Sequence, residues 1–339
     1  MRLIEKVWFK KHTAKYWLIP LLLPLTALFY LISAVRRLAF RFGLLKSYKI
    51  DAPVIVVGNI SVGGNGKTPV VIYLVELAKT LGFKPGVISR GYGGKAEIYP
   101  YLLNENSTTQ QAGDESILIY QRCDIPVVVG ADRVANAQKL IEQGCNIVIS
   151  DDGLQHYRLT RDLELVIVDA KRLFGNGFLL PAGPLREGRW RLKKADQIIY
   201  NGEHFPKNIS LKHKSLLMTL AGSELTNITT GEKRAVVDFL QQWPCVNAIA
   251  GIGEPQRFFD TIKAFGFEVT KQQGFIDHKD YAIHDFTQFK TDLPLLMTEK
   301  DAVKCYAFAH ENWWYLPVSA QFSAQDEQVL LQCVKNFTV

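Results

Sequence analysis

The sequence predicts an α/β protein with two domains and a membrane-associated helix at its N-terminus. Short apolar runs rich in Val and Ile alternate with helical patterns, as in parallel sheets that are covered by helices. The chain has 339 residues, which at roughly 150 residues per domain allows about two domains. We expect a membrane anchor over residues 1–46, a parallel-sheet domain over 47–202, and a connecting region with a smaller α/β domain over 203–339.

The anchor prediction depends on residues 16–35, which carry no charge. As a helix they would reach about 30 Å, the thickness of the hydrocarbon core of a bilayer. The stretch is too long for a signal peptide and no small-residue cleavage site follows it, while Pro20 and Pro24 argue against a straight span. We therefore expect a peripheral or monotopic anchor; the alternative is a buried core helix. Basic residues flank the stretch on both sides, namely Lys10, Lys11, Lys15, Arg36, Arg37 and Arg41.

The positive charge of the chain gathers at this end. Residues 1–50 hold ten Lys and Arg and one acid, a net +9, whereas the remaining 289 residues hold 30 bases and 32 acids, a net −2. A nucleic-acid-binding domain needs a basic face on its folded body, so we expect no nucleic-acid partner; basic flanks suit anionic inner-membrane lipid instead. Five scattered cysteines without a CxxC pair exclude a disulfide framework or zinc ribbon and favour a reducing compartment.

The body of the chain divides into two sets of elements. In the first, buried parallel strands are expected at residues 53–57, 86–89, 127–129, 146–150, 165–168 and 197–200, with helices at 70–81, 115–122 and 133–143. In the second, strands are expected at 248–251 and 295–298, and helices at 256–265, 302–309 and 325–336. Residues 203–233 connect the two sets.

A glycine-rich loop follows the first expected strand. Residues 58–68 read GNISVGGNGKT and lead into a helix with Pro69 in its first turn. This is the context of a phosphate-binding P-loop, in which backbone N–H groups and the helix N-terminus surround phosphate oxygens. The pattern departs from the strict motif at Ser61, and the alternative is a plain glycine-rich turn. The candidate nucleotide-binding residues are Ser61, Val62, Gly63, Gly64, Asn65, Gly66, Lys67 and Thr68.

The P-loop indicates a P-loop NTPase-like fold that uses ATP and Mg²⁺. Lys67 is expected to contact the β- and γ-phosphates and the Thr68 hydroxyl to ligate Mg²⁺. Asp151 and Asp152 follow the strand expected at 146–150, where a carboxylate would face the metal at the carboxyl edge of the sheet. Which of the two is the direct ligand stays open, and a simple Asp-Gly turn is the alternative.

Two classes of ATP-dependent protein fit these motifs. GTP is disfavoured because Thr298-Glu299-Lys300-Asp301 places its lysine one position too late for a base-reading NKxD motif. One class is a kinase that phosphorylates a membrane-bound acceptor, and it needs a base near the acceptor hydroxyl. The other is a membrane-surface P-loop ATPase switch that acts on a protein partner.

Motifs spread along most of the chain favour the kinase. The chain resembles the tetraacyldisaccharide 4′-kinase family of lipid A synthesis, in motif order as well as in motif content, and the family also carries Ser or Thr where Ser61 stands. The matching segments are GNISVGGNGKTP (58–69), SRGYGG (89–94), AGDE (112–115), GADR (130–133), SDDGLQH (150–156), LPAGPLRE (180–187), DHKDY (277–281) and TEKDAVK (298–304).

The resemblance implies the reaction and its site. The γ-phosphate of ATP would go to the 4′-hydroxyl of a glucosamine disaccharide 1-phosphate that bears four acyl chains, at the cytoplasmic face of the inner membrane. Asp114 matches the catalytic aspartate of the family and His278 matches its partner, with Lys67 on the phosphates. Because His278 belongs to the second domain, we expect the pair to assemble when the domains close.

Further residues are expected around these groups. Glu115 would serve the metal or cap the helix that begins at Asp114. Lys300 and Asp301 belong to the matching segment 298–304, and the alternative for them is that they stabilise the second domain. The residues expected around the nucleotide or the acceptor are Gln155, His156, Arg133, Arg186 and Glu187, of which the last three could instead form plain ion pairs.

Overall fold

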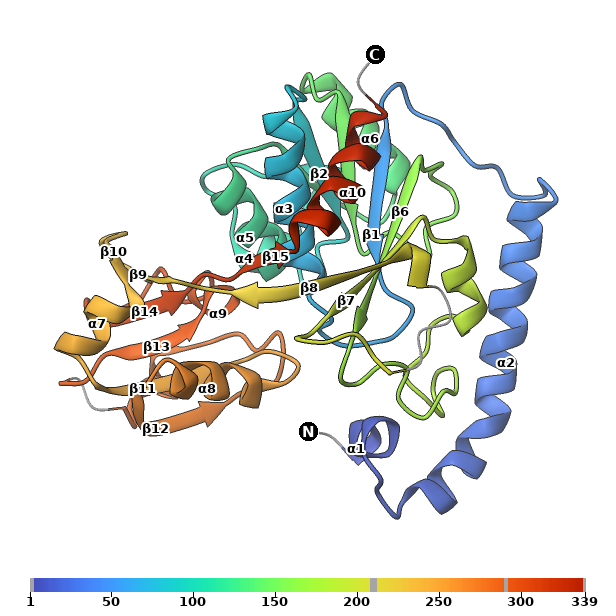
Figure 1. The fold of residues 1–339 in the computed structure, drawn as a ribbon. Coiled ribbons are helices and arrows are strands. Elements are labelled where there is room, and N and C mark those ends of the chain that lie inside the picture. Colours follow the sequence, from blue (N-terminus) through green and yellow to red (C-terminus); the bar gives the residue numbers. More distant parts are fainter. Residues whose placement is uncertain (1–2, 208–211, 290–291, 338–339) are drawn as a thin grey trace.

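The apolar runs predicted as buried strands pair in one large sheet (Figure 1). The computed structural model describes residues 3–207, 212–289 and 292–337. The strand order of this sheet is β15-β8-β7-β6-β1-β5-β2-β4-β3, and its pairs are parallel except β15 with β8 and β3 with β4. The strands are β1 (Val54–Gly58), β2 (Pro85–Ser89), β3 (Tyr101–Leu102), β4 (Val127–Val129), β5 (Ile147–Asp151), β6 (Leu163–Asp169), β7 (Gln197–Asn201), β8 (Ser215–Ala221) and β15 (Ser319–Phe322).

Helices cover both faces of this sheet because its central strands are apolar on both sides. Alternate residues of β1 point to opposite faces: Ile55 packs in the cluster that includes Leu74 of α3, whereas Val56 packs with Leu140 of α6. Burying each such side chain stabilises the fold by about 1.5–3 kcal/mol. The helices are α3 (Lys67–Thr80), α4 (Thr109–Ala112), α5 (Asp114–Cys123), α6 (Arg133–Glu142) and α10 (Ala324–Lys335), with the 3₁₀ helix η1 (Arg189–Lys194). We call this unit the large lobe.

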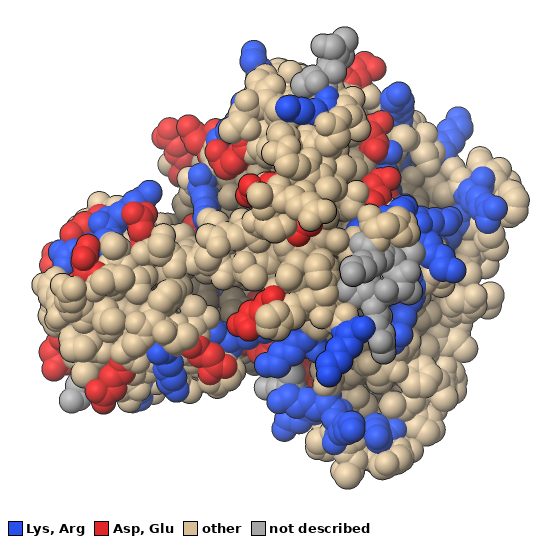
Figure 2. Space-filling view, in the orientation of Figure 1, with Lys and Arg blue, Asp and Glu red and all other residues tan. Residues whose placement is uncertain are grey.

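The predicted anchor forms a long helix on the outside of the large lobe. α2 (Lys15–Arg41) is continuous through Pro20 and Pro24 and follows the short α1 (Leu3–Phe9). It is long and apolar enough to cross a membrane by length and composition, yet almost none of it is buried, so a buried core helix is ruled out. Thr26 is its buried contact, accepting a hydrogen bond from the Ala182 N–H at 3.0 Å. Figure 2 shows a broad uncharged surface where α2 lies, with Lys and Arg near its ends.

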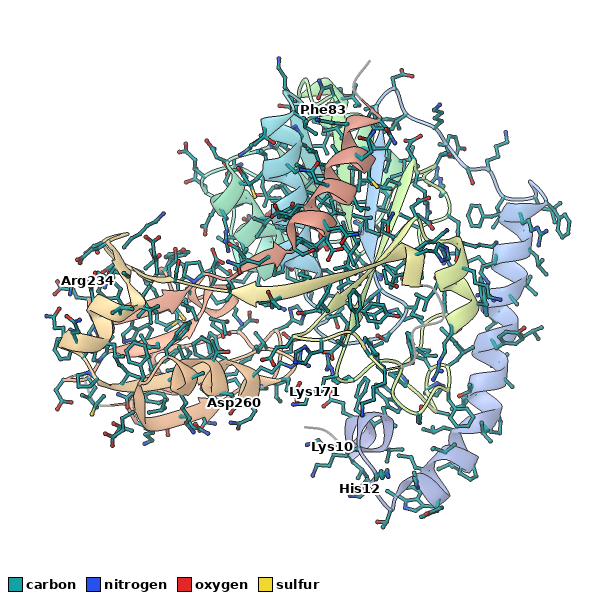
Figure 3. The ribbon with its side chains drawn as sticks, in the orientation of Figure 1. Lys10, His12, Phe83, Lys171, Arg234 and Asp260 are labelled. Atoms are coloured by element: carbon teal, nitrogen blue, oxygen red, sulfur yellow. The ribbon has the colours of Figure 1, made fainter. Side chains whose placement is uncertain are left out.

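A second sheet forms the small lobe. Its order is β10-β9-β14-β13-β11-β12, with β11, β12, β13 and β14 parallel to one another. Aromatic residues fill its core: Phe239 and Trp314 meet edge to face at 4.9 Å, and Arg234 lies over the ring of Trp314. Figure 3 shows Arg234 at the outer end of this lobe. The elements are β9 (Glu224–Asn227), β10 (Lys233–Ala235), α7 (Val236–Gln242), β11 (Cys245–Ala250), α8 (Pro255–Ala264), β12 (Glu268–Gly274), η3 (Ile283–Phe286), β13 (Leu295–Thr298), α9 (Glu299–Ala302) and β14 (Trp313–Leu316); the 3₁₀ helix η2 (Lys212–Lys214) precedes β8.

The predicted fold class is confirmed, with differences in the second half of the chain. The helix expected at 302–309 is wrong, because α9 ends at Ala302 and turns follow it. The large sheet extends past residue 202, since β8 and β15 pair at its edge and α10 packs on α3. β8 alternates buried and partly exposed residues, so it lacks the continuous apolar run of a central strand. The three-part division of the chain stays a proposal, and residues 208–211, 290–291, 1–2 and 338–339 within it lie outside the described residues.

Candidate active site

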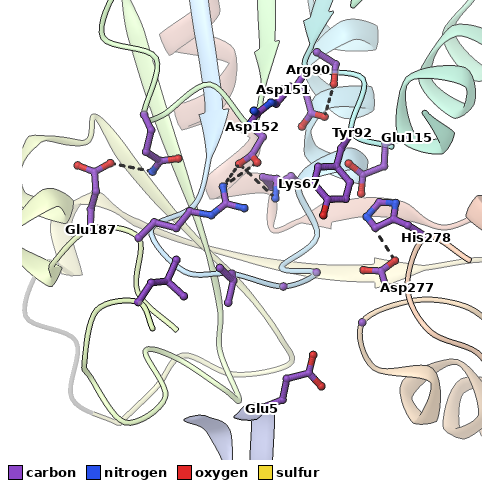
Figure 4. A pocket seen from close by; sticks show the side chains of 18 of the residues that line it. Glu5, Lys67, Arg90, Tyr92, Glu115, Asp151, Asp152, Glu187, Asp277 and His278 are labelled. Carbon is purple, nitrogen blue, oxygen red and sulfur yellow. Dashed lines mark hydrogen bonds and ion pairs between the residues drawn. The ribbon is translucent and has the colours of Figure 1, made fainter. Parts of the chain in front are cut away.

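A cavity of about 1030 Å³ opens between the two lobes at the carboxyl edge of the large sheet. Figure 2 shows the hollow from one side and Figure 4 shows its lining from close by. The cavity collects residues that are far apart in the sequence: the P-loop, the turn after β5, the loop before η1, the loop after β12, and one side of α2. α2 contributes Phe29, Ile32, Ser33, Arg36 and Arg37 to this lining.

The P-loop connects β1 to α3 as the sequence predicts. Val62, Gly63, Gly64 and Lys67 line the cavity. Beneath them, the buried Asn65 amide donates to the Ser61 hydroxyl at 3.0 Å, and Thr68 follows in the first turn of α3.

One glycine of the loop is needed for its conformation. Gly66 has φ +90°, and a Cβ there would lie 2.5 Å from the Asn201 side-chain nitrogen. A left-handed φ and a blocked Cβ position together favour glycine over any other residue.

Lys67 and Asp152 form an ion pair in the lining of the cavity. The Lys67 Nζ lies 3.6 Å from the Asp152 Oδ1, and the Arg186 guanidinium donates to both Asp152 oxygens at 2.9 and 3.1 Å. Burial opposes ionisation of Asp152, but the charges of Lys67 and Arg186 outweigh it and lower the pKa of the carboxyl. Asp152 also has φ +50°, a strained conformation for a residue with a side chain.

Asp151 is buried with one oxygen unpaired. Its side chain is 1% exposed; Oδ2 accepts a long hydrogen bond from the Ser89 hydroxyl at 3.5 Å, and Oδ1 has no hydrogen-bond partner among the described residues. Burial, and next the nearby charge of Glu115, raise the pKa of Asp151 to about 7. An unpaired carboxylate oxygen beside other carboxylates is chemically suited to a divalent cation. Within the described residues no three His, Cys, Asp or Glu side chains lie close enough to enclose a metal by themselves.

Asp114 and His278 meet across the two lobes. Asp114 begins α5 and His278 lies in the loop after β12, and the His278 Nδ1 lies 3.0 and 3.1 Å from the two Asp114 oxygens. Asp114 is only 5% exposed, whereas His278 lines the cavity and packs against Tyr92. The Asp114 Oδ1 also accepts the Glu115 N–H at 2.9 Å, in the first turn of α5, whose N-cap is Gly113.

The electrostatics of this pair favour charge on both groups. Burial opposes ionisation of Asp114, but the hydrogen bond to His278 and the charge of Lys300 outweigh it and lower its pKa. Burial also disfavours the charged imidazole, but the bond to Asp114 outweighs it and raises the pKa of His278. His278 has φ +60°, and such strain in a residue with a side chain is typical of functional sites.

Lys300 lies in the site, beside His278. A role in stabilising the second domain does not by itself predict this position. Its Nζ lies 3.0 Å from the Glu115 Oε1 and 3.0 Å from the Asp277 Oδ1, and 3.4 Å from the His278 Nε2. Lys300 therefore bridges α5 of the large lobe to the small lobe. Asp301, by contrast, is buried in the small lobe, where the Tyr281 hydroxyl donates to it at 2.8 Å.

The remaining predicted residues separate into two groups. Gln155, Arg186 and Glu187 line the cavity, and the Gln155 amide donates to the Glu187 Oε1 at 2.9 Å. Arg133 is buried outside the cavity lining, where it donates to the Asp151 carbonyl at 3.3 Å. His156 also lies outside the lining, and burial, followed by the charge of Arg133, lowers its pKa to about 4.

Sequence reasoning did not assign roles to two further cavity residues, Arg90 and Tyr92. Both follow β2 and face the cavity in Figure 4. Both residues belong to the SRGYGG segment (89–94), which matches the family pattern, and its position directly after a predicted strand could have placed them at the site.

Comparison with known proteins identifies the family of the chain. A family model described as LpxK, tetraacyldisaccharide-1-P 4′-kinase, matches residues 18–335. The tetraacyldisaccharide 4′-kinases of Colwellia psychrerythraea and Psychromonas ingrahamii are 62% and 52% identical to this chain over 331 residues, covering 98% and 97% of this chain and 96% and 98% of those proteins. A crystal structure of LpxK from Aquifex aeolicus in complex with ATP is similar with a TM-score of 0.79 and 29% identity, over 95% of this chain and 100% of that one.

These matches cover nearly the whole chain, including both lobes and the cavity between them. The chain therefore belongs to the tetraacyldisaccharide-1-P 4′-kinase family and is a phosphotransferase that uses an alcohol group as acceptor.

Proposed function

We propose that this chain transfers the γ-phosphate of ATP to the 4′-hydroxyl of a tetraacylated glucosamine disaccharide 1-phosphate, a step of lipid A biosynthesis. The observation that carries the proposal is that the P-loop lines the same cavity as His278, whose Nδ1 lies 3.0 Å from the buried Asp114 carboxylate. The P-loop offers backbone N–H groups for phosphate, and His278 with Asp114 offers a carboxylate–imidazole pair that can accept a proton. A sugar hydroxyl, a poor nucleophile, needs both.

In this mechanism the P-loop and Lys67 hold the β- and γ-phosphates of ATP. The acceptor oxygen attacks the γ-phosphorus. The bond between that phosphorus and the bridging oxygen breaks, so that ADP leaves, and the hydroxyl proton passes to Asp114. His278 orients Asp114 and its imidazolium form balances the carboxylate charge. Asp114 is the base we assign because it matches the catalytic aspartate of the family, and its lowered pKa leaves it ionised, and so able to accept a proton, near neutral pH.

The unpaired Asp151 oxygen supports a magnesium ion bound with the nucleotide. Thr68, Asp151, Asp152 and Glu115 are the residues that would hold it, and Glu115 would exchange its contact with Lys300 to do so. When bound, the ion neutralises charge that develops on the transferring phosphoryl group. Mg²⁺ usually keeps several waters and substrate oxygens as ligands, so a full cage of protein ligands is not required.

The acceptor fixes where the enzyme works. A lipid with four acyl chains stays in a bilayer, since burying each CH₂ is worth about 0.8 kcal/mol. The exposed apolar surface of α2 suits the membrane, and Arg36 and Arg37 carry positive charge from this helix into the cavity. We propose that α2 embeds at the inner membrane and holds the cavity at headgroup height. Because ATP is supplied in the cytoplasm, the cavity would face that side.

The test is transfer of radiolabel from γ-labelled ATP to the disaccharide monophosphate in mixed micelles. The native chain should place label in the lipid, and Asp114→Ala should not. Label in free phosphate alone, at a rate indifferent to the disaccharide, would instead favour the ATPase switch with a protein partner.

A further inference from the structure

Arg172, which has no assigned role so far, lies behind the P-loop. It is in the 170–188 loop that leaves β6, and its side chain is 10% exposed. One guanidinium nitrogen donates to the Gly64 carbonyl at 2.7 Å and to the Asn65 Oδ1 at 3.3 Å. Arg172 is not among the residues that line the cavity, so it contacts the P-loop from its outer side.

The hydrogen bond to the Gly64 carbonyl fixes the orientation of the peptide that joins Gly64 to Asn65. A trans peptide holds its C=O and the following N–H on opposite sides, so a carbonyl fixed toward Arg172 turns the Asn65 N–H away from it. The next carbonyl is held in the same way, because the Asn201 amide donates to the Asn65 carbonyl at 3.0 Å. A P-loop binds phosphate only when successive N–H groups converge on it. Arg172 and Asn201 therefore favour the backbone conformation in which the P-loop N–H groups converge, even without bound phosphate.

Arg172 is itself fixed by a buried acid. Its Nε donates to the Asp169 Oδ2 at 3.1 Å, and Asp169 is 1% exposed at the end of β6. The same carboxylate accepts the Lys171 and Arg172 backbone N–H groups at 2.9 and 2.7 Å and pairs with Arg257 of α8 at 2.6 Å. Asp169 thus fixes the orientation of the Arg172 guanidinium, and the Nη2 of Arg172 remains directed at the Gly64 carbonyl.

The other side of Arg172 meets the N-terminal helix. Its guanidinium stacks over the ring of Phe9 in α1, with 5.2 Å between the guanidinium carbon and the ring centroid. Next to this stack, the Trp8 indole N–H donates to the Pro181 carbonyl at 3.1 Å. Figure 3 shows Lys171, the neighbouring residue, between α1 near Lys10 and α8 near Asp260.

We propose that Arg172 is a positioning residue that holds the P-loop in its phosphate-receiving shape and links that shape to the docking of α1. The inference rests on the proposed ATP site of the P-loop. Arg172 touches neither phosphate nor acceptor; it acts through the Gly64–Asn65 peptide. Loss of Arg172 weakens ATP binding and leaves the phosphoryl-transfer step at saturating ATP nearly unchanged.

The experiment measures ATP binding to the full chain in detergent micelles by calorimetry, without acceptor, and kcat and the KM for ATP with acceptor. Arg172→Met should raise the Kd and KM for ATP about tenfold or more, the effect of losing a charge-assisted hydrogen bond, with kcat changed less than threefold. Arg172→Lys should recover part of the affinity, because lysine cannot bond Gly64 and Asp169 in one fork. Phe9→Ala should weaken ATP binding about twofold to fivefold.

Arg189→Met is the matched control, since Arg189 follows the same loop, stacks on Phe174 and makes no hydrogen bond or ion pair with the P-loop among the described residues. It should leave the Kd for ATP unchanged. Native affinity in Arg172→Met, or an equal loss in Arg189→Met, would overturn the proposal. If Arg172→Met fails to fold, native affinity in both Arg172→Lys and Phe9→Ala overturns it. A native chain that binds ATP without phosphorylating the disaccharide would refute the proposed acceptor and leave this inference intact.

Discussion

At the residue scale, the mechanism depends on whether Asp114 or His278 accepts the proton of the acceptor hydroxyl. If Asp114 is the base, Asp114→Asn should lower kcat by about 10²–10⁴-fold, the usual contribution of general base catalysis. His278→Gln keeps a hydrogen-bond donor and should cost less. The measurement is kcat from labelled transfer at saturating ATP. Because His278 lines the cavity while Asp114 is 5% exposed, an equal or larger loss in His278→Gln would assign the proton acceptor to the imidazole.

The same pair predicts a titration that needs no turnover. The pKa of His278 is raised in the folded chain, because the bond to Asp114 outweighs burial. A raised folded pKa stabilises the fold below the unfolded value of about 6.5, and this stabilisation is lost as the pH rises through the folded pKa. Asp114→Asn should bring the pKa of His278 below that of the native chain, as followed by NMR of labelled histidine.

The control for this titration is Asp277→Asn. Asp277 lies 3.8 Å from the His278 Nε2 and ranks after Asp114 among the causes of the shift. Asp277→Asn should therefore lower the pKa of His278 less than Asp114→Asn does. A pKa of His278 that is equal in Asp114→Asn and in the native chain would contradict the hydrogen bond.

At the scale of elements, the P-loop depends on glycine at one position more than at others. Gly66→Ala forces a left-handed alanine whose Cβ meets the Asn201 amide at 2.5 Å. We expect at least a tenfold rise in the Kd for ATP, because the loop must shift to relieve that contact. Gly82→Ala is the matched control, since Gly82 has φ +82° with nothing within 4 Å of its Cβ position.

Calorimetry separates the two glycines. Gly82→Ala should lower the free energy of unfolding by about 1 kcal/mol and leave ATP affinity as it is. An equal loss of affinity in both variants would attribute the effect to general destabilisation of the fold and not to the Asn201 contact in the loop.

α2 gives the second prediction for an element. Leu28 lies on its exposed face, and a charge placed in a bilayer costs about 2.5–3.5 kcal/mol. Leu28→Glu should therefore lower binding to liposomes of inner-membrane lipid by about 10²-fold in flotation assays, with thermal unfolding in detergent unchanged. Val237→Glu, at another exposed apolar position, on α7 of the small lobe, should float as the native chain does. Normal flotation of Leu28→Glu would place α2 outside the membrane.

At the scale of the whole molecule, sequence reasoning reached local elements more fully than their assembly. Each central strand and the P-loop consist of contiguous residues with a recognisable pattern, as in the apolar run Val54–Gly58, so the sequence predicts them directly. β15 could not be placed, because an edge strand of four residues pairs with β8 about a hundred positions earlier. Lys300 was missed as a site residue for the same reason: its partners Glu115 and Asp277 come from two lobes. The approach of Asp114 to His278 was expected from the family resemblance and not from spacing.

The contact between lobes gives the last prediction. Arg122 of α5 pairs at 2.6 Å with Glu299 of α9, the residue before Lys300, and donates to the Val318 carbonyl at 2.9 Å. Removing both charges in Arg122→Met with Glu299→Gln loosens the lobes without leaving a buried acid unpaired. A looser cavity admits water, so the ratio of labelled free phosphate to labelled lipid should rise several-fold while the KM for ATP changes little. Arg158→Met, which breaks an exposed pair with Asp132 inside the large lobe, should keep the native ratio. An unchanged ratio in the double variant would mean that the lobes are held by other contacts, with the Lys300 bridge as the next to remove.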